Sequence, residues 1–282
     1  MQHMLGNDGV VVDAESEATN LDAISERLVD ARLCARPLSS FPGDLPRSLN
    51  NAYRIQATSI RAWPDEISGW KVGGVPSAFQ RQFDAERLSG PIFSTSTFSV
   101  ADGETISMSI FDGGFAAIEA EFIVRTAVTI GPGDVDVTAV DVREMIASLS
   151  IGAETASSPL ADINRLGPAA IVSDFGNNAG LVVGPAIVDW QDRFSERITI
   201  HVTVDDDPVG RVVVAIDDGV LAAVRFLIEL CAARGIHLPA GTLVSCGALS
   251  GIHDVNVGSV ASVQFEGLGA FDVQFTERQP AV

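Results

Sequence analysis

The spacing of hydrophobic residues divides the chain into a helical first part and a β-rich remainder. Within residues 20–38, apolar side chains recur at helical intervals, which predicts a helix. Asn20 or Asp22 could cap the start of this helix, and Pro37 would end it. A second helix is predicted within residues 44–63, where the same periodicity returns.

From residue 68 onward, short apolar runs alternate with Gly and Pro, which predicts many short strands. These runs are residues 69–75, 90–95, 97–100, 115–128, 148–154, 169–175, 180–187, 198–214, 242–247 and 259–275. One further helix is predicted at 219–235, where Gly235 suits a C-terminal cap. This order of elements indicates an α+β chain, with a helical section at 1–66 and a β-rich domain at 67–282.

Charge excludes some classes of partner. The 282 residues include 37 acidic and 18 basic side chains, a formal net charge of −19. Nucleic acids and anionic membranes need basic patches, so we expect neither as a partner. An anionic substrate would need a local positive centre.

The cysteines and the chain start bear on location. The three cysteines are far apart and form no CxxC pair, which indicates reduced thiols in a cytoplasmic protein. No apolar run reaches the length of a membrane span, and the first residues do not resemble a signal peptide.

Glu119 and Glu121 interrupt an otherwise apolar stretch, GFAAIEAEFIVR at residues 114–125. Residues two apart in a strand point to the same face, so the two carboxylates would project side by side. Ala117 and Ile123 continue that face and indicate burial, where like charges repel. The pair could face water, titrate as a coupled acid–base pair, or share a cation.

A third carboxylate, Glu154, follows the short apolar run SLSIGA. Three carboxylates with no nearby Cys or His would suit Mg²⁺ or Mn²⁺ and would not suit zinc. Spacing alone does not bring Glu154 to the other two, so this cation site is a hypothesis.

Lys71 lies in ISGWKVGG and is either a lysine at a strand edge or a pocket residue. Trp70 and the following glycines favour the pocket. Near a metal the pKa of Lys71 should fall, which would let it move protons. Gly73 and Gly74 could bring backbone N–H groups to a substrate carboxylate, or could simply form a turn.

Six segments in this order carry a family resemblance: AYRIQ, GWKVGGVPSAFQRQF, GPIF, GFAAIEAEF, IGAE and GLGAFDVQF. Together they resemble the fumarylacetoacetate hydrolase superfamily. Within it, they are most similar to the branch of 2-keto-4-pentenoate hydratases and 4-oxalocrotonate decarboxylases. The resemblance extends from about residue 50 to residue 276.

The resemblance implies a mixed β-sandwich or roll, with the catalytic domain at 67–282. It also implies a metal site on Glu119, Glu121 and Glu154, and an active-site lysine at Lys71. Family members act on 2-hydroxydienoates and related 2-oxo acids. They form homo-oligomers, and some associate with the next enzyme of their pathway.

The chain departs from the family at two places. After Glu154, the segment ETASSPL stands where relatives carry Asp-Ser-Arg, and SDFGNNAG replaces an Asp-Asn-Ala-Ser type of motif. Within SDFGNNAG, Asp174, Asn177 and Asn178 could line the pocket or cap a turn.

Four other residues are candidates for the site. His253 lies in a Gly-rich loop and could be a general acid or base, or a hydrogen-bonding loop residue. Arg81, Arg87 and Arg165 could hold a second substrate carboxylate or hydroxyl groups.

These features predict a cytoplasmic, Mg²⁺- or Mn²⁺-dependent hydro-lyase, which adds water to a 2-hydroxy-2,4-dienoate or 2-oxo-enoate to give a 4-hydroxy-2-oxo acid. The alternatives are decarboxylation of a 2-oxo-enedioate, dehydration of a 2-keto-3-deoxy sugar acid and C–C hydrolysis of an acylpyruvate. A further alternative is a catalytically silent subunit that assembles with a partner enzyme.

Overall fold

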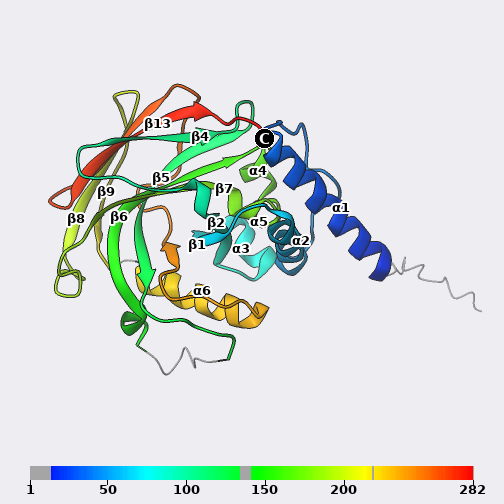
Figure 1. Ribbon diagram of the computed structural model, residues 1–282, viewed down its shortest axis with the longest axis horizontal. Helices are drawn as coiled ribbons and strands as arrows, with labels where there is room; N and C mark the ends of the chain where they lie inside the picture. Colours follow the sequence, from blue (N-terminus) through cyan, green and yellow to red (C-terminus); the bar gives the residue numbers. More distant parts are fainter. Residues whose placement is uncertain (1–13, 134–140, 218, 282) are drawn as a thin grey trace, which may run out of the picture.

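The computed structural model describes residues 14–133, 141–217 and 219–281. In this part of the chain, helices α1 to α5 gather on one side of two curled β-sheets (Figure 1). The helices are α1 (Ala14–Leu33), α2 (Leu49–Ala62), α3 (Ser77–Phe83), α4 (Ile163–Leu166), α5 (Pro168–Ser173) and α6 (Val220–Arg234). Each of these helices is too short or too polar to cross a membrane.

The larger sheet has the strand order β2-β1-β10-β5-β6-β7-β3, with β11 paired to β5. Its strands are β1 (Ile67–Gly74), β2 (Arg87–Phe93), β3 (Thr97–Ser99), β5 (Phe115–Thr126), β6 (Ile146–Ser158), β7 (Asn178–Ala186), β10 (Leu243–Ser245) and β11 (His253–Asp254). Most pairs are antiparallel, but β1 runs parallel to β10 and β3 runs parallel to β7.

The smaller sheet has the order β4-β13-β12-β8-β9. Its strands are β4 (Thr105–Ile110), β8 (Arg197–Val204), β9 (Asp207–Ala215), β12 (Val260–Phe265) and β13 (Gly269–Glu277). The parallel pair of β13 with β4 makes this sheet mixed as well. The α+β prediction and the β-sandwich or roll architecture are therefore confirmed.

The main apolar core lies between the two sheets. Phe122 of β5 meets Phe265 of β12 there, with ring centroids 5.7 Å apart. Side chains alternate along a strand, so Glu119 and Glu121 of β5 project from the opposite face of the larger sheet. That face is the one on which α4, α5 and the turn after α5 contribute to a cavity.

The elements differ from the sequence predictions in several places. The predicted cap at Asn20 or Asp22 is wrong, because α1 already includes Ala14. The second helix starts later than expected, with Ser48 as its N-cap. The C-terminal cap of α6 at Gly235 is confirmed by its left-handed conformation.

One predicted strand, at 169–175, is wrong. These residues form the helix α5 and the start of a short 3₁₀ turn, η3 (Phe175–Asn177). Pro168 occupies the first position of α5, where a proline favours a helix start. The sequence prediction also omitted β4, β11, α3 and α4.

The turn η3 is strained and closely packed. Phe175, Gly176 and Asn177 have φ values of 54°, 68° and 54°. Non-glycine residues rarely adopt such values, at a cost on the order of 1–3 kcal/mol each. The turn lies directly on β2 because Gly90 has no side chain: a Cβ there would lie 2.1 Å from the carbonyl oxygen of Phe175.

We predict that Gly90→Ala destabilises the protein by about 3 kcal/mol, because the added methyl group must displace η3. Gly74→Ala is the matched control, since a Cβ at Gly74 would meet no atom within 4 Å. Urea unfolding of both variants checks this. Equal stability of the two variants would contradict the close approach of η3 to β2.

Candidate metal centre

The register of β5 and β6 brings three carboxylates together. Glu154 of β6 pairs directly with Glu119 of β5, and Glu121 lies two residues further along the same face. One carboxylate oxygen from each residue lies within 4.8 Å of those of the other two. The residues are 4%, 0% and 0% exposed for Glu119, Glu121 and Glu154. Of the alternatives considered for the glutamate pair, exposure to water is therefore excluded.

Hydrogen-bond donors hold two of the carboxylates. The hydroxyl of Ser245 and the backbone N–H of Gly247, at 2.9 Å, both donate to Oε2 of Glu121. The side-chain amide of Asn178 donates to Oε1 of Glu154 at 3.0 Å. In the described part of the chain, Oε1 of Glu121 and Oε2 of Glu154 accept no hydrogen bond although both are buried.

Lys71 is the cation of this cluster. Its Nζ lies 3.3 Å from Oε2 of Glu154 and 3.4 Å from Oδ1 of Asn177. Burial alone would lower the pKa of Lys71, but attraction by Glu154, Glu119 and Glu121 outweighs burial and raises it. The fall in pKa predicted from the sequence applied to a lysine near a bound metal, whose charge would offset the carboxylates.

The carboxylates are hard to ionise in the absence of a further positive charge. Burial raises the pKa of Glu119 to about 7, and repulsion by Glu154 adds to this effect while Lys71 opposes it. The pKa of Glu121 is also raised, first by burial and then by the charges of Glu154 and Glu119. Three ionised carboxylates and one ammonium would leave a net charge of −3 + 1 = −2 in the cluster.

This arrangement fits a divalent cation. The donor set consists of oxygen atoms only, which Mg²⁺ and Mn²⁺ prefer. The buried oxygens without hydrogen-bond partners, on Glu121 and Glu154, are where a ligand bond could replace the missing interaction. Glu119, Glu121 and Glu154 could therefore hold the cation, with their net charge balanced by it.

A cavity of about 530 Å³ opens onto the cluster. Lys71 and Glu119 line it together with Gly73, Gly74 and Asn177. The loop that follows β10, including Gly247, forms another part of the wall. The cluster thus lies beside a space large enough for a small organic acid.

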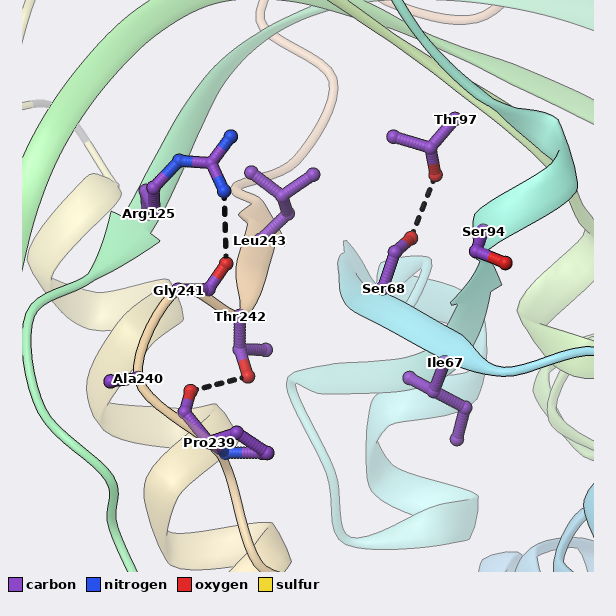
Figure 2. A pocket seen from close by; sticks show the side chains of 10 residues that line it. All are labelled: Ile67, Ser68, Ser94, Thr97, Arg125, Pro239, Ala240, Gly241, Thr242 and Leu243. Atoms are coloured by element: carbon purple, nitrogen blue, oxygen red, sulfur yellow. Dashed lines mark hydrogen bonds between the residues drawn. The ribbon is translucent and has the colours of Figure 1, made fainter.

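A second pocket, of about 430 Å³, lies at the other end of β1 and β10 (Figure 2). None of the predicted site residues lines it. Figure 2 shows its polar groups bonded to one another: Ser68 with Thr97 at 2.7 Å, and Arg125 with the carbonyl of Gly241 at 3.2 Å. This pocket offers no cluster of reactive groups.

Two predicted site residues lie away from the cavity wall. His253 pairs with Ile118 of β5, so its side chain projects from the face opposite Glu119. There its Nε2 lies 3.1 Å from the hydroxyl of Ser250. Asp174 is buried in an ion pair with Arg32 and accepts a hydrogen bond from Ser158 at 2.6 Å.

Several residues that support the site were not predicted. Ser245 and Gly247 follow a short apolar run, and no spacing rule links them to Glu121. Arg32 lies in a predicted helix, where an arginine is ordinarily on the surface, yet it is only 3% exposed. Its guanidinium also donates to the carbonyl of Asn178 at 2.9 Å, so α1 supports the segment that orients Glu154.

We predict that Mg²⁺ or Mn²⁺ raises the melting temperature of the wild type and not of Glu121→Gln. Binding to the native state alone stabilises it by about 2.7 kcal/mol at a hundredfold excess over Kd. Without metal at pH 8, Glu121→Gln should melt higher than the wild type, because one uncompensated buried charge is removed. Glu277→Gln, at an exposed position, is the control and should respond like the wild type.

We predict that the metal-free protein loses stability as the pH rises from 5 to 8. Glu119 has a pKa of about 7 in the folded chain against an ordinary value of 4.5, so the folded chain retains a proton that the unfolded chain has lost. Its stabilising contribution is complete below pH 4.5 and is lost as the pH rises through 7, by about 3 kcal/mol. Denaturant unfolding in a chelator checks this. Glu119→Gln should show a flatter profile, and an equally steep one would contradict the assignment.

Comparisons with known proteins agree with this fold. No protein-family model matches the chain. A 4-oxalocrotonate decarboxylase of Pseudomonas putida is 28% identical over 268 residues, which cover 90% of this chain and 96% of that protein.

Two solved structures extend the likeness. The 4-oxalocrotonate decarboxylase from Pseudomonas putida G7, complexed with magnesium and adipate, has a TM-score of 0.72 at 22% identity. The match covers 91% of this chain and 97% of that one. Fumarylpyruvate hydrolase from Pseudomonas aeruginosa, in complex with Mn²⁺ and pyruvate, has a TM-score of 0.54 at 18% identity, covering 77% and 91%. With a shared fold and a sequence likeness over nearly its whole length, the chain is a divergent member of the fumarylacetoacetate hydrolase superfamily.

Proposed function

We propose that the chain is a divalent-metal-dependent lyase that acts on a 2-oxo acid, and that its reaction is the hydration of a 2-hydroxy-2,4-dienoate. The observation that carries the proposal is the buried cluster of Glu119, Glu121 and Glu154 beside Lys71, at the wall of a closed-sided cavity. The magnesium and Mn²⁺ complexes of the structural neighbours support the choice of metal.

The cation would supply a Lewis acid and a positive centre for the carboxylate and 2-oxo oxygens of the substrate. Such a centre matters in a chain of net charge −19, which would otherwise repel an anionic substrate. Gly73 and Gly74, also on the wall, leave room for the substrate to approach the backbone.

Lys71 is the proton carrier in this proposal. Hydration moves four protons: one leaves the 2-hydroxyl group, one adds to C5, one leaves the attacking water and one adds to C3. The Lys71 ammonium can donate the proton to C5 and recover one from the water that attacks C4. Asn177 and Glu154 hold the ammonium in place through their contacts at 3.4 and 3.3 Å.

Asn178 is a positioning residue for the same step. Its side-chain amide donates to Glu154 and so fixes the carboxylate that pairs with Lys71. Asp174 has no direct role in this proposal, because its carboxylate is engaged by Arg32 and Ser158. It would act only by holding the segment that carries Asn177 and Asn178.

Decarboxylation of a 2-oxo-enedioate is the second candidate, and the activity named for the Pseudomonas putida relative favours it. In that reaction the bond to the far carboxylate breaks, its electron pair moves along the conjugated chain to the 2-oxo oxygen, and CO₂ leaves. Acylpyruvate hydrolysis has less support, since His253 points away from the cavity. Homo-oligomerisation, association with a pathway enzyme and a cytoplasmic location stay predictions of the sequence.

The test is turnover of freshly generated 2-hydroxypenta-2,4-dienoate with Mg²⁺, followed by ultraviolet absorbance and product mass. Hydration predicts metal-dependent loss of the dienol and a product heavier by one water. In parallel, 2-oxohex-3-enedioate should be offered. Loss of CO₂ from it, with no hydration of the dienol, would overturn the proposed reaction in favour of decarboxylation.

We predict that Lys71→Met lowers kcat/KM by about 10²-fold or more, because it removes the proton carrier. Metal binding should persist, since the carboxylates remain and lose a competing cation. Lys71→Arg keeps the charge but does not give up a proton near neutral pH, so it should be as inactive as Lys71→Met. Full activity in Lys71→Arg would show that the charge alone is required.

A further inference from the structure

Arg87 lines the same cavity as Lys71 and Glu119. It is the first residue of β2 and is half-buried, and its backbone pairs with Gly74 of β1. A Cβ at Gly74 would meet no atom within 4 Å, so the space beside this pair is open. Arg87 therefore borders accessible volume within the substrate cavity.

Arg87 is unlike the other two arginines that the sequence offered as substrate-binding candidates. Arg165 is 73% exposed and pairs with Asp162, and Arg81 is exposed on α3. Neither lines the cavity. Among the described residues, Arg87 forms no hydrogen bond or ion pair with a protein group.

The lack of a partner is informative in so acidic a chain. Acidic side chains outnumber basic ones 37 to 18, so a half-buried guanidinium has many possible partners. A cation partly removed from water and left without an anion is costly. An anionic ligand group would supply the missing interaction, and guanidinium binds carboxylates through two parallel hydrogen bonds.

We propose that Arg87 binds a second acidic group of the substrate, at the end opposite the 2-oxo acid head. The proposal rests on the proposed function, which places the 2-oxo acid head at the carboxylate cluster. It narrows the substrate class to 2-oxo acids with a second carboxylate, and it makes Arg87 the residue that selects them.

The assignment bears on the reaction as well. A carboxylate paired with arginine is stabilised in the ground state, whereas loss of CO₂ would move its charge away from the cation. Binding that favours the ground state over the transition state does not accelerate a reaction. Arg87 therefore suits a substrate whose far carboxylate is kept, which agrees with hydration better than with decarboxylation.

The test is calorimetric binding of saturated 2-oxo acids with Mg²⁺, in pairs of equal length. The diacids are 2-oxoglutarate, 2-oxoadipate and 2-oxopimelate, and the monoacids are 2-oxopentanoate, 2-oxohexanoate and 2-oxoheptanoate. In the wild type, at least one diacid should bind 10-fold or more tightly than its monoacid. Arg87→Met should remove this difference and leave monoacid binding unchanged, and Arg87→Lys should retain part of it. Arg81→Met is the matched control and should behave like the wild type.

The outcomes separate the two proposals. If monoacids bind with metal but no diacid binds more tightly, or if Arg87→Met keeps the preference, Arg87 is not the anion site and the proposed function stands. If no 2-oxo acid binds in a metal-dependent way, the proposed function fails, and this inference fails with it. Melting temperatures of the variants establish that each is folded.

Discussion

The burial of three carboxylates beside a single lysine is the constraint on which the rest of this structure depends. Ionised, the cluster would carry a net charge of −2, and each unbalanced buried charge costs several kcal/mol. The protein reduces this cost with donors from Ser245, Gly247 and Asn178 but leaves two buried oxygens without a partner. A divalent cation cancels the remaining charge, so the same feature that weakens the metal-free chain creates its reactive site.

The site is assembled from segments that are far apart in the sequence. β1 contributes Lys71, β5 and β6 contribute the carboxylates, and η3 sets Asn177 beside the ammonium. The strained turn η3 stays in place because Gly90 lets it lie on β2 and because Arg32 of α1 binds Asp174 just before it. The N-terminal helices thus take part in supporting the site and do not merely precede it.

The sequence predicted the face shared by Glu119 and Glu121, because alternation in a strand is a local property. It did not predict that Glu154 lies directly opposite Glu119, since the pairing register of distant strands is set by tertiary packing. The same limit explains His253: its distance from the carboxylates follows from its pairing with Ile118, not from its neighbours in the chain. The segment 169–175 was predicted as a strand because a short apolar run suits either a strand or a buried helix, and Pro168 was the missed signal for the helix.

The most direct measurement of the central claim is X-ray diffraction from crystals grown with Mn²⁺, collected where manganese scatters anomalously. The account predicts one strong anomalous peak per chain, bonded to oxygens of Glu119, Glu121 and Glu154, with Lys71 adjacent and open positions facing the cavity. Absence of a peak at saturating Mn²⁺, with the three carboxylates sharing protons and hydrogen bonds instead, would contradict it.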